Sequence, residues 1–240
     1  MRTDGSSVKL YLLDVEGTTS PVSLVYEQLF PYARWHMESY LRAHIGEQEI
    51  ARDVAQLAGL GNVPVEAVSA GGAEPDLIHR AVAEALYLMD QDFKVPLLKR
   101  LQGKVWKDGY ESGMLAGTVF PDVPAALERW SRAAKVAIYS SGSVEAQQLL
   151  FRHSSAGDLT RFISAYFDTE TGPKTASASY LAIAEQMQVA PEDVLFFSDV
   201  LRELDPAREA GCMTRLAVRE GNTAVADTNE HVSVMDFSRV

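Results

Sequence analysis

Short, continuous apolar runs that end in polar turns recur along the chain. Three clear runs and one weaker run are Lys9–Leu13, Val136–Tyr139, Val194–Phe197 and Thr214–Val218. Such runs are typical of strands that are buried on both faces of a parallel sheet. Between them, apolar residues recur at helical spacing, which predicts helices over 123–134, 144–151 and 179–187. Because strands and helices alternate, we expect an α/β fold with a doubly wound parallel sheet, which is a Rossmann-like arrangement.

The segment 21–114 breaks this alternation. It shows helical periodicity instead, clearest over Leu77–Met89 and again over Leu97–Trp106. Strand signals resume at Gly117–Phe120. We therefore expect a helical cap that is inserted after the first strand of the sheet. The predicted division is an α/β core of residues 1–20 and 115–240, with a cap of residues 21–114.

Composition and charge narrow the possible partners. The 240 residues include 22 Lys and Arg against 33 Asp and Glu, which gives a formal net charge of -11. Such a charge disfavours binding to nucleic acid or to an anionic membrane surface. The single cysteine, Cys212, excludes an intrachain disulfide and a zinc site with several thiolates. We find no apolar stretch of membrane-spanning length and no targeting segment, so we expect a cytoplasmic protein.

Polar residues follow the three clear apolar runs, where the strands of an open parallel sheet present their ligand-binding edge. They are Asp14, Glu16 and Thr18 after the first run, Ser140 and Ser141 after the second, and Asp199 and Glu203 after the third. Lys174 lies in a loop between the second and third runs. Carboxylates that converge repel one another, and a bound divalent cation relieves that repulsion. Magnesium with a phosphate substrate suits this set of oxygen ligands and donors.

Each of these motifs also has an ordinary structural interpretation. Asp14–Thr18 alone is compatible with a simple turn, because an acid, glycine and threonine all favour turns. Ser140–Ser143 could cap a helix that starts near Val144. Lys174 alone would be a solvated surface residue. Glu203 is more consistent with a supporting or helix-start acid than with a direct metal ligand. The order of all these residues along one chain favours a functional site.

The motifs also resemble a known family. The chain resembles the haloacid-dehalogenase-like hydrolase superfamily in the order of its motifs. Two acids, Gly and Thr follow the first strand, a Ser follows the second, and a loop Lys and an Asp after a further strand come later. More narrowly, Leu13–Pro21 and Tyr139–Gln147 resemble the enolase-phosphatase family, also called acireductone synthase, of methionine salvage. The second acid of the opening motif is usually aspartate in the superfamily, but it is glutamate in the enolase-phosphatase family, as Glu16 is here. Further similar segments are Leu101–Trp106, Phe120–Val123 and Asp199–Glu203.

The resemblance implies a magnesium-dependent reaction in two parts. The substrate would be 2,3-diketo-5-methylthiopentyl-1-phosphate, which enolises and then loses phosphate to give the acireductone 1,2-dihydroxy-3-keto-5-methylthiopentene. The residues that it implies for Mg²⁺ are Asp14, Glu16 and Asp199, and those for the substrate are Ser140, Ser141 and Lys174. We expect Asp14 to be the nucleophile and Glu16 to take part in enolisation, in a protein that acts as a monomer.

Three other functions remain open from the sequence. Another small-molecule phosphatase of the same superfamily would be expected to carry aspartate at position 16. A phospho-receiver domain also places acids, a hydroxyl and a lysine on a parallel sheet, but it needs no helical insertion. An inactive binding relative is disfavoured, because every carboxylate that catalysis would need is present.

Overall fold

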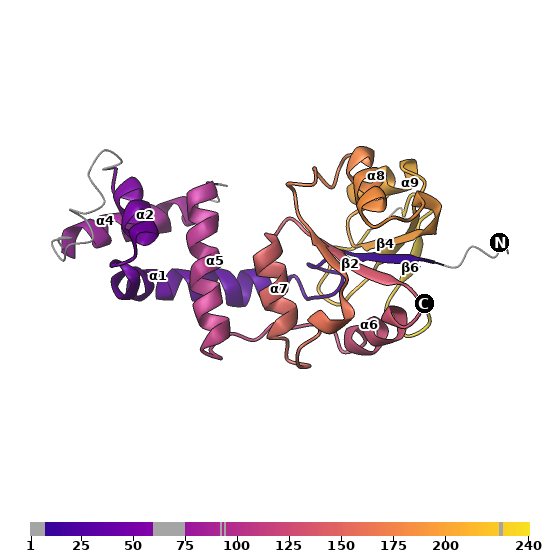
Figure 1. Ribbon diagram of the computed structural model, residues 1–240, viewed down its shortest axis with the longest axis horizontal. Coiled ribbons are helices and arrows are strands. Elements are labelled where there is room, and N and C mark those ends of the chain that lie inside the picture. The colour runs from indigo at the N-terminus through magenta and orange to yellow at the C-terminus, as the bar shows by residue number, and fades with distance from the viewer. Residues whose placement is uncertain (1–7, 60–74, 92, 94, 226–227) are drawn as a thin grey trace. The chain divides into compact units, whose positions relative to one another are not determined.

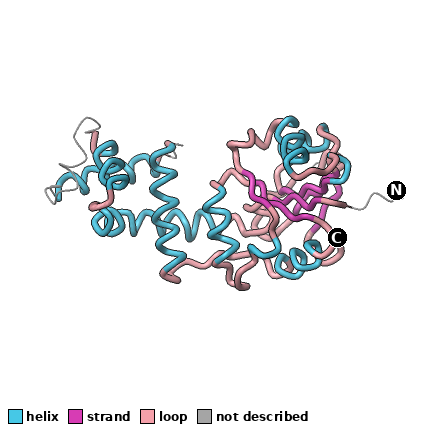
Figure 2. Tube along the Cα trace, in the orientation of Figure 1, coloured by secondary structure: helices cyan, strands magenta, loops and turns pink. Residues whose placement is uncertain are grey.

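The computed structural model describes residues 8–59, 75–91, 93, 95–225 and 228–240. The chain divides into two compact units. The core unit consists of the described residues up to Val25 together with Ala116–Val240, and the cap unit is Tyr26–Leu115. Figure 2 shows that the described cap residues are helices and loops, whereas every strand lies in the core unit. The sequence predicted the insertion over 21–114.

The core unit is built on a six-stranded sheet whose neighbouring strands are all parallel. The strands are β1 (Leu10–Leu13), β2 (Lys135–Tyr139), β3 (Ala165–Phe167), β4 (Val194–Ser198), β5 (Met213–Ala217) and β6 (Val232–Val234). Their order is β3-β2-β1-β4-β5-β6, so β1 lies at the centre between β2 and β4. The predicted α/β fold with a doubly wound parallel sheet is confirmed, and the four predicted strands are present to within one residue at each end.

Helices cover both faces of this sheet. They are α6 (Val123–Ser131), α7 (Val144–Arg152), α8 (Ser177–Gln186) and α9 (Leu201–Glu209). Figure 1 shows α8 and α9 on one face and α6 on the other. Neighbouring strand residues face opposite ways: Leu12 packs in the cluster that contains Tyr180 of α8, whereas Tyr11 stacks on Trp130 of α6 with ring centroids 4.4 Å apart. Burial on both faces explains why the strands read as continuous apolar runs.

Two strands and one connection differ from the prediction. β3 and β6 escaped detection because each has only three residues at an edge of the sheet. The predicted strand Gly117–Phe120 is wrong. Gly117 donates its amide to His153 O at 2.8 Å, and Phe120 donates to Thr19 O at 3.0 Å, so these amides bind loops rather than a neighbouring strand. An added Cβ at Gly117 would lie 2.1 Å from the Leu150 carbonyl oxygen, so the segment packs directly against α7.

The cap unit is a small helical bundle. Its described residues form the helices α1 (Phe30–His44), α2 (Gln48–Leu57), α4 (Pro75–Asp90) and α5 (Pro96–Glu111), preceded by a π-helical turn over Leu24–Leu29. α1 packs against α4 and α5, and α2 packs against α4. Both helical stretches predicted from the sequence are present, as α4 and α5. An ion pair of 2.6 Å between the buried carboxylate of Asp53 and Arg100 joins α2 to α5.

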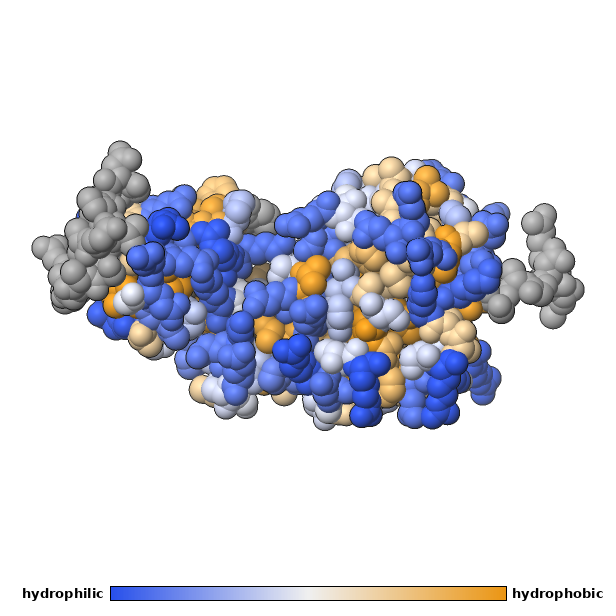
Figure 3. All heavy atoms as spheres, viewed as in Figure 1, coloured by the Kyte–Doolittle hydropathy of each residue, from blue (hydrophilic) through white to orange (hydrophobic). Residues whose placement is uncertain are grey.

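The surface agrees with the composition. Figure 3 shows hydrophilic residues spread over the viewed face of the described residues, with small apolar patches between them. Among the described helices, none is both long enough and apolar enough to cross a membrane.

Candidate active site at the carboxyl edge of the core sheet

Three neighbouring strands end at one place in the core unit. Asp14 follows β1, Ser140 follows β2 and Asp199 follows β4, and these strands are adjacent and parallel. Backbone pairing continues for one more residue beyond β1, because the Asp14 amide donates to Phe197 O at 3.0 Å. The sheet therefore delivers these three polar side chains to the same edge, as the sequence predicted.

A tight loop follows Asp14. The carbonyl oxygen of Val15 accepts hydrogen bonds from the amides of three successive residues, Thr18, Thr19 and Ser20, at 3.2, 3.0 and 2.9 Å. Gly17 makes this turn possible with a φ of +68°, a conformation that strongly favours glycine. A Cβ at Gly17 would also lie 2.3 Å from Oδ2 of Asp199. The loop thus brings its own backbone directly against the carboxylate that follows β4.

Side chains from the segment after β5 form hydrogen bonds with the backbone of this loop. Asn222 Nδ2 donates to Gly17 O at 2.8 Å, and Arg219 Nε donates to Thr18 O at 3.2 Å. Arg219 is itself buried and forms two hydrogen bonds of 3.0 Å to the two carboxylate oxygens of Asp122. Because both loop carbonyls have fixed donors, the backbone between Asp14 and the next helix has little freedom to move.

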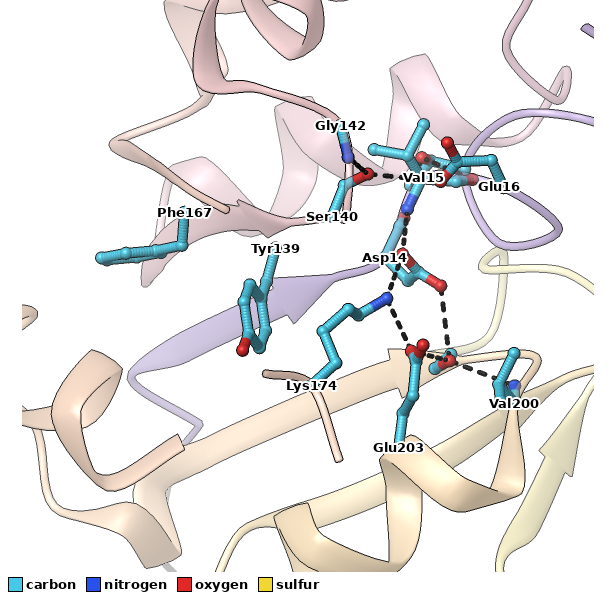
Figure 4. Close-up of polar contacts among 12 residues, drawn as sticks. Asp14, Val15, Glu16, Tyr139, Ser140, Gly142, Phe167, Lys174, Val200 and Glu203 are labelled. Carbon is cyan, nitrogen blue, oxygen red and sulfur yellow. Dashed lines mark hydrogen bonds and ion pairs between the residues drawn. The ribbon is translucent and has the colours of Figure 1, made fainter. Parts of the chain in front are cut away.

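Lys174 is the centre of a buried ion cluster. Its Nζ lies 2.5 Å from Oδ1 of Asp14 and 2.6 Å from Oε2 of Glu203, and Figure 4 shows it between the two carboxylates. The Lys174 side chain is only 8% exposed. Ser198 donates to Glu203 Oε2 at 2.9 Å and lies 3.4 Å from Asp14 Oδ2, which closes the cluster on the side of β4.

The electrostatic environment keeps this lysine charged. Burial alone would lower the pKa of Lys174, but the negative charges of Asp14 and Glu203 outweigh it and raise the pKa above its ordinary value. Burial, followed by the charge of Asp14, raises the pKa of Glu203, and Lys174 partly offsets that shift. The ion pairs therefore stabilise a buried ammonium group that would otherwise be too costly to bury.

The other two acids also have perturbed pKa values. Burial, and after it the charge of Asp14, raises the pKa of Asp199 to about 7 and raises the pKa of Glu16 as well. Ser140 Oγ donates to Glu16 Oε2 at 3.2 Å, and it also accepts the Gly142 amide at 3.1 Å. Four carboxyl groups, those of Asp14, Glu16, Asp199 and Glu203, thus share this edge with one ammonium group.

The predicted site residues are placed as follows. Asp14 contacts Lys174, Glu16 contacts Ser140, and Asp199 lies against the loop that carries Glu16. Ser141 is exposed, at the step from β2 to α7. Ser143 caps α7, because its side chain accepts the Ala146 amide at 3.3 Å, which is the capping role that the sequence suggested for this segment.

Glu203 and Ser198 make contacts that the sequence did not predict. Glu203 was expected to be a supporting or helix-start acid. It lies in the first turn of α9 but reaches Lys174 directly, so it sets the position and charge of the lysine. Ser198 is not among the residues predicted for the site, although its hydroxyl lies between Asp14 and Glu203. The available signal for Glu203 was its position in the first turn of the helix that follows Asp199.

A metal ion would find oxygen donors here. Among the described residues, no group of three or more His, Cys, Asp or Glu side chains is arranged to hold an ion by itself. Magnesium usually keeps several waters and binds one or two carboxylates together with substrate phosphate. Burial and, after it, the charge of Asp14 raise the pKa of Asp199, and a bound cation relieves this kind of cost. The donor set therefore fits magnesium.

Comparison with known proteins gives consistent matches over almost the whole chain. The family described as haloacid dehalogenase-like hydrolase matches residues 8–211. A protein of Pseudomonas aeruginosa (strain LESB58) named Enolase-phosphatase E1 is 43% identical over 235 residues, which are 98% of each chain. One of the same name from Synechococcus elongatus is 47% identical over 220 residues, 91% of this chain and 92% of that protein.

A solved structure matches equally broadly. The crystal structure of the UTR4 protein of Saccharomyces cerevisiae is 34% identical to this chain, with a TM-score of 0.81. The match covers 98% of this chain and 100% of the yeast chain.

Gly17→Ala tests how closely the loop must approach Asp199. The substitution forces a side chain into a left-handed conformation, which costs about 1–2 kcal/mol, and places a methyl group against the Asp199 carboxylate. We expect phosphatase activity to fall about 100-fold, because a displacement of about 1 Å is enough for such a loss. Steady-state phosphate release and Tm measure the two effects.

Gly157→Ala is the matched control, because Gly157 also has a positive φ of +88° but nothing within 4 Å of an added Cβ. It should lower Tm through the left-handed strain alone, less than Gly17→Ala does, and leave activity within about twofold. If both variants lose activity equally, the contact with Asp199 has no special importance.

Proposed function

Because the chain belongs to the haloacid dehalogenase-like hydrolases and, within them, to the enolase-phosphatases, we propose that the carboxyl edge of its core sheet performs both halves of their reaction. The protein is an enolase-phosphatase: it converts 2,3-diketo-5-methylthiopentyl-1-phosphate to the acireductone 1,2-dihydroxy-3-keto-5-methylthiopentene and phosphate, in methionine salvage. The observation that carries the assignment to this edge is the buried cluster of Asp14, Lys174 and Glu203 beside Asp199. Its monomeric state and its cytoplasmic location stay predictions.

Asp14 is the nucleophile of the phosphatase half. Its carboxylate would attack phosphorus and form an aspartyl phosphate, and the phosphoester oxygen would leave with the product. Lys174 binds Asp14 from one side, so its ammonium group is already in place to offset the charge of the phosphate oxygens. We also assign Ser140 and Ser141, at the end of β2, to substrate binding; Ser140 would exchange its hydrogen bond to Glu16 for one to a phosphate oxygen. Water then hydrolyses the aspartyl phosphate and restores the carboxylate.

Magnesium is the cofactor that this edge suits. Haloacid dehalogenase-like phosphatases generally use Mg²⁺, and we assign its binding to Asp14, Glu16 and Asp199. When bound, the cation would reduce the repulsion between the nucleophilic carboxylate and the phosphate dianion. The chain itself supplies one ammonium group against four carboxyl groups here, so additional positive charge is needed to admit a dianion.

Glu16 is our candidate for a participant in the enolase half. Enolisation requires a base that removes a proton beside a carbonyl group, and a carboxylate is more effective when its pKa lies closer to the working pH. Burial and the charge of Asp14 raise the pKa of Glu16 in this direction. The hydrogen bond from Ser140 holds the carboxylate in one orientation. Glu16 is one methylene longer than the superfamily's usual aspartate, which extends its reach beyond the phosphate.

Asp14→Asn tests the nucleophile. The amide has nearly the same shape but neither attacks phosphorus nor serves as a good magnesium ligand, so phosphate release should fall about 1,000-fold or more. Phosphate release from the diketone phosphate is followed with saturating magnesium, while Tm verifies folding. Asp199→Ala is the comparison variant, whose activity should be partly restored by excess magnesium. Near-normal phosphate release by Asp14→Asn would refute the assignment of the nucleophile.

Glu16→Asp separates the two halves of the reaction. The change keeps the charge but withdraws the carboxylate by about one carbon–carbon bond, so enolisation should lose about 100-fold and hydrolysis of a simple phosphate ester about tenfold or less. Enol absorbance with the diketone phosphate and phosphate release from p-nitrophenyl phosphate measure the two losses. Glu16→Gln, which removes the charge, should impair both. Equal losses on both substrates in Glu16→Asp would remove the enolisation role from Glu16.

A further inference from the structure

Three side-chain hydroxyl groups bind the backbone of the loop that carries Lys174. The carbonyl oxygens of Gly172–Lys174, in chain order, accept hydrogen bonds from Tyr139, Ser179 and Tyr180 at 2.9, 2.8 and 2.7 Å. This loop forms no strand and no helix, and of the three carbonyl oxygens that of Pro173 also accepts a backbone amide, that of Ala176 at 3.0 Å. We call Tyr139, Ser179 and Tyr180 the hydroxyl clamp.

The clamp is buried and closely packed. Tyr139, Ser179 and Tyr180 are exposed by 0, 3 and 1%. Gly172, with a φ of +143°, lets the loop lie directly on α8, because a Cβ there would be 2.3 Å from Ser179 Oγ. The ring of Tyr180 packs against those of Tyr139 and Phe196 at centroid distances of 5.7 and 5.1 Å. These contacts fix where each hydroxyl group points.

Tyr180 also reaches the second half of the ion cluster. Its hydroxyl oxygen lies 2.9 Å from the carbonyl oxygen of Glu203, as well as 2.7 Å from that of Lys174. The same hydroxyl group therefore touches the backbones of the two residues whose side chains form an ion pair of 2.6 Å. α8 and α9 pack against each other at this point.

We propose that Tyr180, supported by Tyr139 and Ser179, is a positioning residue that fixes the backbones of Lys174 and Glu203 so that the ammonium group meets the phosphate. This role rests on the function proposed above for Lys174. A lysine side chain has four flexible methylene groups, so the position of its ammonium depends on a fixed backbone. A displacement of about 1 Å can cost about 100-fold in rate. The clamp ties three successive carbonyl groups of the lysine loop to buried side chains of β2 and α8.

Tyr180→Phe tests the proposal, because it removes one oxygen atom and keeps the packed ring. We expect kcat for the diketone phosphate to fall about tenfold, with a smaller change in Tm than in kcat. The matched control is Tyr166→Phe in β3, whose hydroxyl is buried and has no hydrogen-bond partner among the described residues. Its kcat should stay within about twofold of the wild type.

The decisive comparison repeats Tyr180→Phe in a Lys174→Ala background. If the clamp acts through the lysine, the second substitution should cause no further loss of kcat. An equal loss in both backgrounds would mean a general structural role and would overturn the clamp, while the function of Lys174 would stand. Wild-type activity in Lys174→Ala alone would instead refute the lysine's role, and the clamp proposal would fall with it.

Ser179→Ala provides a second variant with a smaller change in shape. It should lower kcat about threefold, and this loss should also vanish in the Lys174→Ala background. If Tyr180→Phe proves unstable, Ser179→Ala tests the proposal instead. An equal loss of kcat from Ser179→Ala in the wild type and in Lys174→Ala would overturn the clamp.

Discussion

The buried lysine between two carboxylates is the interaction on which the site depends. Lys174 is almost fully buried, and such a charge persists only when oppositely charged groups surround it. Asp14 and Glu203 supply that charge from the ends of two different elements, β1 and α9. Removing one partner of a buried ion pair lowers the free energy of unfolding by about 3–5 kcal/mol. The cluster therefore matters for the stability of the fold as well as for the reaction.

The fold meets this constraint by placing separate segments at one edge of a parallel sheet. The central strand β1 presents Asp14, and its neighbour β4 presents Ser198 and Asp199. Behind the Asp14 loop, Arg219 and Asn222 bind the carbonyls of the turn. The result is a site in which like charges are held close together by the backbone, a cost that a magnesium ion and a phosphate substrate would relieve together.

The sequence predicted the central features of this arrangement and missed those that depend on the edges. Runs such as Val194–Phe197 can be recognised in the sequence because central strands are apolar on both faces. β3 has only three residues, too few for a pattern, and Gly117–Phe120 has apolar residues whose amides bind loops instead of a strand. The β-branched and aromatic residues of Gly117–Phe120 therefore led to the wrong prediction of a strand.

The site shows the same division. Asp14, Ser140 and Asp199 could be placed together because each directly follows a strand of the same sheet. The direct contact of Glu203 with Lys174 could not, because it depends on the entry angle of α9. Tyr139 and Tyr180 are indistinguishable by pattern from other core aromatics; only their hydroxyl groups, which the apolar periodicity ignores, reveal a second role.

The central claim is that Asp14 and Glu203 keep Lys174 charged, and NMR of the side-chain nitrogen measures this most directly. In magnesium-free protein labelled with ¹⁵N-lysine, the Lys174 resonance is identified by its loss in Lys174→Arg. The account predicts that Nζ is still predominantly an ammonium at pH 10.5, where an ordinary lysine is half deprotonated, and that Glu203→Gln lowers its pKa. A Lys174 that is half or more deprotonated at or below pH 10.5 would contradict the account.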